Sequence, residues 1–125
     1  MIGNLPNTIK KHSKAFSLVS DASNNLTVVS SGASILNDLV VINLSATVRY
    51  LHIFDSNVIS PALEATTPKF IFPIPSSVDG AGFTIPFSKG VEFSTGIIIC
   101  LVSSVPDIKT TIGAGEVILN LTYEN

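Results

Sequence analysis

Short strand-like runs recur along this chain and constrain its fold more than any other feature. Runs rich in β-branched and aromatic residues follow one another from residue 26 to residue 124. Turn signals separate them at intervals of roughly 8–15 residues, which is typical of all-β proteins. No stretch of about ten residues or more keeps the apolar spacing of an amphipathic helix without a breaker. The chain is therefore predicted to be all-β.

The positions of the runs predict seven strands and several sheet edges. We expect strands at 26–31, 33–45 (interrupted at Asn37-Asp38), 47–55, 69–75, 81–87, 91–104 and 116–124. Four prolines, Pro68, Pro73, Pro75 and Pro86, lie in or beside the runs 69–75 and 81–87. Because proline cannot donate to a sheet ladder, we expect these strands to be edges or to end early. Residues 60–67 begin like a helix, but a loop is the expectation there.

The chain of 125 residues has the length of one domain. We expect an extended N-terminal arm over residues 1–20, in which "AFSLVS" could form a short strand, followed by a β-sandwich over residues 21–125. The predicted fold class is an antiparallel, jelly-roll-like β-sandwich with this arm.

Several of the expected strands are apolar on both faces. In "TVRYLHIFD", Leu51 and Ile53 share one face while Tyr50 and Phe54 share the other. Such strands predict cover on both sides: the domain's own core on one, and a second sheet or a neighbouring subunit on the other. Only 13% of the residues are charged, which also favours a surface covered by other protein.

The residue types offer little chemistry. The chain has two histidines, about 40 residues apart, and one cysteine, Cys100, in an apolar run that predicts an inert thiol. No catalytic, metal-binding or cofactor-binding cluster is recognisable, so we expect neither an enzyme nor a cofactor. With a net charge of −2 we expect no nucleic-acid partner, and the apolar runs are too short for a membrane span. No signal peptide is recognisable, which predicts synthesis in the cytoplasm.

Two sets of residues are candidates for partner binding. The basic cluster Lys10, Lys11, His12 and Lys14 either keeps the arm solvated or docks it on an acidic surface of a partner protein. Arg49 and Asp55 flank Leu51 and Ile53 on one strand face. They would lie at the rim of a subunit contact, or form a solvated pair that contributes little.

The order of the runs resembles a group of small all-β virion proteins of tailed bacteriophages and prophages. The matching segments are "LTVVSSGASILNDLVVIN", "ATVRYLHIFDSN", "TPKFIFPIP", "GVEFSTGIIICLVS" and "GEVILNLTYEN", over about residues 26–124. The matching residues are Gly32, Arg49, Tyr50, Leu51, Phe54, Asp55, Pro68, Pro75, Phe93, Gly96, Ile97, Glu116, Val117 and Tyr123. They are structural positions and include no functional signature, and residues 1–20 do not fit the pattern.

The resemblance implies a structural virion protein. The expected role is that of a capsid cement or decoration protein, which binds the outside of the major capsid protein lattice and stabilises the shell. The alternative is a module of the tail or fibre that recognises a host glycan or another virion protein. The expected assembly is a homo-oligomer, with a trimer favoured because shells offer three-fold positions.

Overall fold

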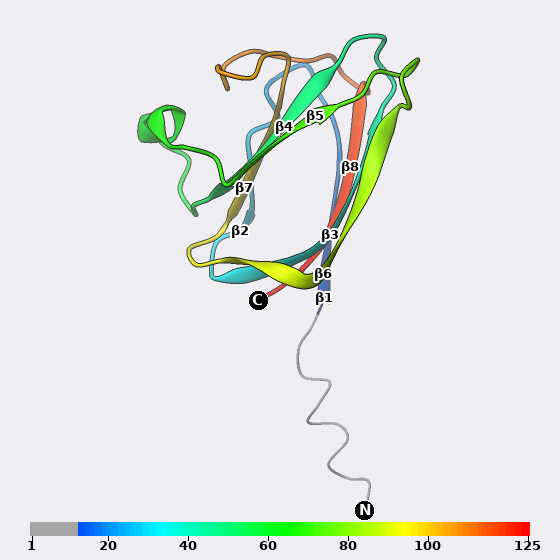
Figure 1. Ribbon diagram of the computed structural model, residues 1–125. Helices are drawn as coiled ribbons and strands as arrows, with labels where there is room; N and C mark the ends of the chain where they lie inside the picture. The colour runs from blue at the N-terminus through cyan, green and yellow to red at the C-terminus, as the bar shows by residue number, and fades with distance from the viewer. Residues whose placement is uncertain (1–12) are drawn as a thin grey trace, which may run out of the picture.

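The computed structural model describes residues 13–125, which form a two-layer β-sandwich (Figure 1). The strands are β1 (Ser13–Val19), β2 (Thr27–Ser30), β3 (Ser34–Asn43), β4 (Arg49–Asp55), β5 (Phe70–Ile74), β6 (Gly82–Phe93), β7 (Ile97–Val102) and β8 (Val117–Glu124). A 3-10 helix, η2, covers Pro61–Ala65, where a loop was the expectation and a helical turn the lesser alternative. Among residues 13–125 no helix is long and apolar enough to cross a membrane.

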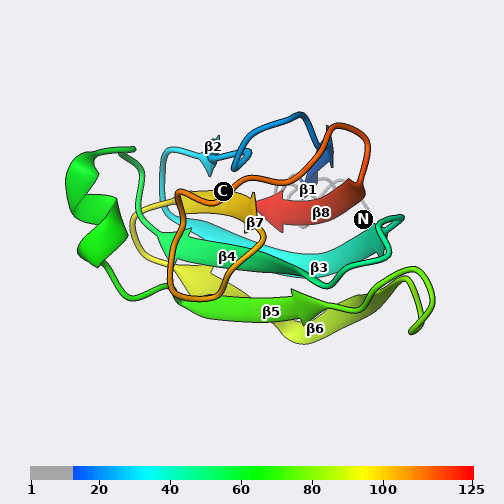
Figure 2. The ribbon, with the colours of Figure 1, turned by 90° about the horizontal axis from the view of Figure 1, so that it is seen from above.

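The two sheets have the strand orders of a jelly roll. Sheet A has the order β1-β8-β3-β6 and sheet B the order β2-β7-β4-β5, and the pairs within each sheet are antiparallel. Two interleaved Greek keys of this kind define the jelly roll. The end-on view in Figure 2 places β1 and β2 along one open side of the sandwich and β5 and β6 along the other. The expected antiparallel β-sandwich is confirmed.

Segment 13–19 of the expected arm is the edge strand of sheet A. Residues Ser13 to Val19 pair with β8 in continuous register, from Ser13 opposite Glu124 to Val19 opposite Ile118. Phe16 and Leu18 pack against the main core. The sandwich therefore includes β1, and the part of the expected arm that precedes it lies outside the described residues.

The pairing of β3 with its neighbours is irregular where the sequence predicted an interruption or a gap between strands. The interruption expected at Asn37-Asp38 is a shift of register in β3, which continues beyond it. Opposite this shift, β6 has extra residues at 87–90, between the two runs predicted at 81–87 and 91–104. Gly90 lies there at φ +72, and a Cβ on it would come within 2.3 Å of the Ile35 side chain. Glycine is required because it alone adopts this backbone conformation at no steric cost.

The main core fills the space between the sheets. It is formed by inward-facing residues that include Leu39, Leu51, Ile53, Ile99 and Leu119, which are fully or almost fully buried. β5 and β6 are the outermost strands of sheet B and sheet A. The prolines in these strands therefore lie in edge strands, as predicted.

The outer face of sheet B is covered by the chain itself. A second buried cluster there contains Phe54, Ile98 and Cys100 from the sheet, Leu63 from η2, and Ile108 from the β7–β8 connection. In Figure 1, η2 (green, left) lies on the side of sheet B that faces away from sheet A. The ion pair of Lys109 with Glu64, at 3.4 Å, joins the two covering segments. The cover expected from a second sheet or a neighbouring subunit is thus supplied by two short connections of the same chain.

Candidate interaction surface

Four phenylalanines line the open side of the sandwich between β5 and β6. We call Phe70, Phe72, Phe83 and Phe87 the phenylalanine strip. The ring centroids of Phe70 and Phe72 lie 5.3 Å apart in a stacked arrangement, and Phe87 stacks on Phe70 at 6.0 Å. The Phe72 and Phe83 rings are tilted at 5.6 Å. The rings thus bridge the edge strands of two different sheets.

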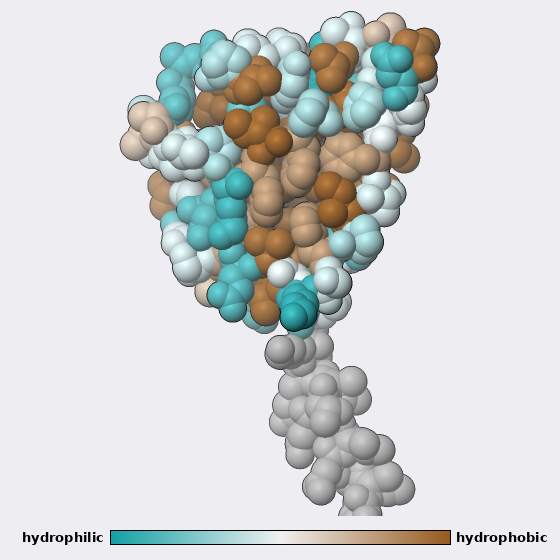
Figure 3. Space-filling model, viewed as in Figure 1, coloured by the Kyte–Doolittle hydropathy of each residue, from teal (hydrophilic) through white to brown (hydrophobic). Residues whose placement is uncertain are grey.

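The strip is part of the solvent-facing surface. All four rings are half-buried, with one side packed against the main core. Figure 3 shows a continuous apolar area in the middle of the face viewed there. Ile71 of β5 is 41% exposed beside it. Aromatic side chains on an apolar patch rimmed by polar residues are typical of protein-binding surfaces.

Strand addition at this side is hindered. Pro73 lies in β5 and Pro86 in β6, and neither has the backbone N–H that an incoming strand would need. A partner on the strip would therefore be held by side-chain packing, not by a shared sheet.

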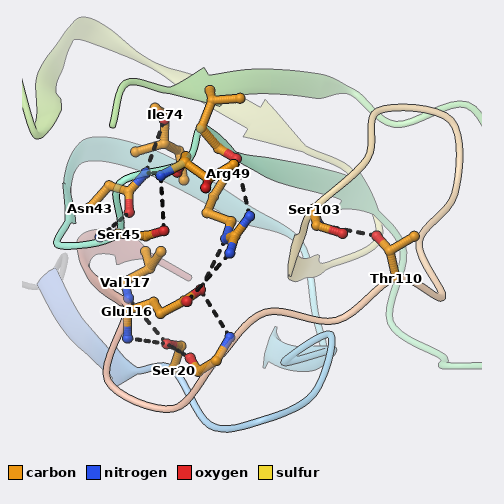
Figure 4. A network of polar contacts seen from close by, with 12 residues as sticks. Ser20, Asn43, Ser45, Arg49, Ile74, Ser103, Thr110, Glu116 and Val117 are labelled. Atoms are coloured by element: carbon orange, nitrogen blue, oxygen red, sulfur yellow. Dashed lines mark hydrogen bonds and ion pairs between the residues drawn. The ribbon is translucent and has the colours of Figure 1, made fainter. Parts of the chain in front are cut away.

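Arg49, a candidate partner-binding residue, pairs within the molecule (Figure 4). Its Nε donates to Glu116 Oε1 at 3.0 Å, and its Nη2 donates to Glu116 Oε2 at 3.3 Å. Glu116 also accepts the N–H of Gly113 at 2.9 Å. The hydrogen bond from Arg49, followed by that from Gly113, holds the pKa of Glu116 below its usual value. This pair connects β4 of sheet B to the start of β8 in sheet A.

The same network holds the β7–β8 connection against the end of β1. Ser20 Oγ donates to the carbonyl of Gly113 at 2.8 Å and accepts the N–H groups of Glu116 and Val117. Ser20 is 4% exposed. Arg49 therefore belongs to an internal structural contact, and it has no solvated pair with Asp55.

Asp55, the other candidate on β4, organises the turn between β6 and β7. Its carboxylate accepts the backbone N–H groups of Ser94, Thr95 and Gly96 at 3.0, 2.9 and 3.3 Å, and the Ser94 hydroxyl at 3.1 Å. Burial alone would raise the pKa of this carboxyl, but these hydrogen bonds outweigh it and hold the pKa below its usual value. Asp55 is thus accounted for by a role in folding.

His52 and Cys100 are buried beside each other on the outer face of sheet B. They are paired residues of β4 and β7 and are 2% and 0% exposed. Burial raises the pKa of the Cys100 thiol to about 12 and lowers the pKa of His52. Neither ring nitrogen of His52 has a hydrogen-bond partner among residues 13–125. Both side chains are therefore neutral near pH 7, and Cys100 is held as an unreactive thiol.

The basic cluster is only partly within the described residues. Lys14 is exposed on β1, whereas Lys10, Lys11 and His12 lie outside the described range. Lys14 forms no ion pair with any described residue.

Two surface hollows are lined by residues that do not form a recognisable catalytic or metal-binding group. The larger, of about 370 Å³, lies at one end of sheet A and is lined by Ile35, Phe93, Glu92 and Glu124 among others. The smaller, of about 290 Å³, lies between η2 and the β7–β8 connection. Within residues 13–125 no group of three or more His, Cys, Asp and Glu side chains is placed to hold a metal ion.

No protein-family model matches the chain, and no curated protein matches it. The resemblance to phage virion proteins therefore enters the functional argument only as a proposal.

Sequence reasoning did not single out the phenylalanine strip. Phe70 and Phe72 are two residues apart, and Phe83 and Phe87 are four residues apart. Even spacing of this kind places each pair on one face of its strand. That signal was readable, but it could not show that the two strands are edges of different sheets on the same side. The strip is the surface that the sequence-derived candidates missed.

Proposed function

We propose that this protein is a structural component of a bacteriophage particle, a cement protein that binds the outside of the capsid lattice and stabilises the shell. The observation that carries the proposal is the phenylalanine strip, an aromatic surface on a sandwich whose candidate residues Arg49 and Asp55 are engaged in internal contacts. The jelly roll is compatible with this role, because the fold occurs in viral capsid proteins, but it also occurs in lectins and enzymes.

The strip supports a role in a repetitive lattice for a physical reason. The whole strand β5, of 5 residues, is about 17 Å long and the sheets are about 10 Å apart, so the strip between them covers at most a few hundred Å². Such an area is below the roughly 800 Å² per partner of a standard stable interface. Weak contacts of this size give strong attachment when several of them are linked in one copy or one oligomer and engage a regular surface together.

The proposal is tested on particles produced by cells that encode the protein. Purified particles are separated on a density gradient, the protein is detected by a specific antibody, and the same antibody locates it by electron microscopy. We expect the protein to comigrate with heads and to decorate their surface. Its absence from particles would exclude a virion role, and label confined to tails would favour the tail-associated alternative.

A further inference from the structure

The four sheet edges of the sandwich differ in how well they accept another strand. Edge strand β2 has four residues and a register shift. Edge strands β5 and β6 contain prolines, and β6 also has the irregularity at 87–90. Short strands, prolines and bulges are the devices by which proteins block strand addition. In the described part of the chain, three of the four edges therefore carry such a device.

The fourth edge, β1, has none of these three devices, and its one charged residue, Lys14, lies near its N-terminal end. The strand is seven residues long, and it pairs with β8 without a register shift or a proline. Its residues are exposed except for Phe16 and Leu18, which are half-buried. Within residues 13–125, no other strand lies on its outer side.

The free backbone groups of β1 can be assigned from the ladder. The N–H of Ser20 donates to the carbonyl of Val117 in β8 at 2.9 Å. Because successive residues of an antiparallel strand direct their N–H and C=O groups to opposite neighbours, the even-numbered residues of β1 face β8. The groups of Ser13, Ala15, Ser17 and Val19 therefore face outward, away from β8.

We propose that β1 pairs with β1 of a second copy of this chain, antiparallel about a two-fold axis at Phe16. This register places Ala15 opposite Ser17 of the second copy and Ser13 opposite its Val19. All the outward-facing residues then meet one another as hydrogen-bonded pairs, with about eight hydrogen bonds in total. The two A sheets become one continuous sheet.

Charge favours a second copy as the occupant. The basic residue Lys14 lies near the beginning of β1, and the acidic Asp21 follows its end. An antiparallel pair brings the basic end of one strand toward the acidic end of the other. Lys14 itself comes opposite Leu18, so no like charges face each other within the paired strands. The two Phe16 rings come opposite each other, an arrangement that stabilises strand pairs.

The available area fits a modest dimer. The strands β1 and β2 form one open side of the sandwich (Figure 2). At about 3.3 Å per residue, the 7 residues of β1 are about 23 Å long, and two sheets about 10 Å apart are roughly 20 Å thick with their outer side chains. Pairing would bury roughly 1,000 Å² over both copies, which is near the lower limit for specific interfaces. The predicted assembly is thus a concentration-dependent dimer, in contrast to the trimer expected from the resemblance. The inference does not depend on the proposed function.

The test measures the mass of the full-length protein by light scattering across a concentration series. We expect a species of twice the 13.2 kDa chain mass at high concentration. Ser17→Pro removes an outward-facing donor without touching the ladder to β8, and we expect it to be a monomer. Circular dichroism and a thermal melt establish that the variant is folded.

A matched pair of double variants tests the register itself. Ala15→Lys with Ser17→Lys places like charges opposite each other at two symmetric positions, whereas Ala15→Lys with Ser17→Glu places opposite charges there. We expect the dissociation constant of the first variant to exceed that of the second by about tenfold or more. A wild-type chain that is monomeric throughout the series or trimeric, or equal dissociation constants for the two double variants, would overturn the proposal.

Discussion

His52 and Asp55 lie on opposite faces of β4 and illustrate two kinds of ionisable residue in this sandwich. Asp55 is ionised and accepts several hydrogen bonds, whereas His52 is neutral and buried, and its ring nitrogens have no hydrogen-bond partner in the described part of the chain. The first stabilises a turn, and the second carries an energetic cost. A buried polar group without a partner costs about 1–3 kcal/mol relative to a satisfied one.

His52→Leu should stabilise the protein, and more at acidic pH. The pKa of His52 is lowered in the folded state below its unfolded value of 6.5, so the unfolded chain binds a proton first as the pH falls. The wild type therefore loses stability below about pH 6.5, a loss that the leucine variant lacks. Urea unfolding should give a gain of about 1 kcal/mol at pH 7 and a larger gain at pH 5. Parallel curves for the two proteins would contradict this account of His52.

Asp55→Ala should destabilise the fold without changing its core. The substitution leaves three backbone N–H groups of the β6–β7 turn without their acceptor, which should cost about 1–2 kcal/mol in urea unfolding. Since the pKa of Asp55 is lowered in the folded state, its contribution is complete above the unfolded pKa of 3.8 and is lost as the pH falls through the folded value. Glu64→Ala, which removes an exposed ion pair, is the control and should cost less than about 1 kcal/mol.

At the scale of elements, most strands were predictable, but the cover of sheet B was not, and the single strand expected at 91–104 is divided between β6 and β7 by a turn at 94–96. Runs such as 69–75 and 116–124 are recognisable as strands because their residues alternate between the two faces, include β-branched or aromatic residues and are flanked by turn signals. The cover of sheet B depends on Leu63 and Ile108, in connections that also contain exposed apolar residues such as Val58 and Val105. Neither has a periodic pattern around it, so the sequence indicated that cover was needed but not where it came from. The partner of Arg49 was hidden for a similar reason, because Glu116 lies 67 residues away and in the other sheet.

Because η2 covers the outer face of sheet B, we expect a substitution of its one buried residue to lower the stability of the protein markedly. Leu63 is 3% exposed and packs in the cluster on the outer face of sheet B. Leu63→Ala should lower the free energy of unfolding by about 2–3 kcal/mol, because it removes buried methyl groups and leaves a cavity. Val58→Ala changes a residue that is 60% exposed in the same connection and should have an effect within about 0.5 kcal/mol. Equal, small effects of both substitutions would show that η2 contributes little to the cover.

At the scale of the whole molecule, the two open sides of the sandwich are differently built. The β5–β6 side is aromatic and hindered for strand addition, and the β1–β2 side presents a regular free strand. We propose that the first side binds the capsid surface and that the second binds another copy of the chain. The two contacts can form at the same time because they lie on opposite sides of the sandwich (Figure 2).

The most direct test of this account is the number of copies bound per head for two matched variants. Phe72→Lys places a charge in the phenylalanine strip, and Val58→Lys places the same charge at an exposed apolar residue elsewhere. Heads lacking the protein are saturated with each purified, folded variant, and the bound copies are counted by quantitative mass spectrometry. The account predicts wild-type occupancy for Val58→Lys and a loss of at least about tenfold in affinity for Phe72→Lys. Equal occupancy and affinity of the two variants would contradict the assignment of the strip as the binding surface.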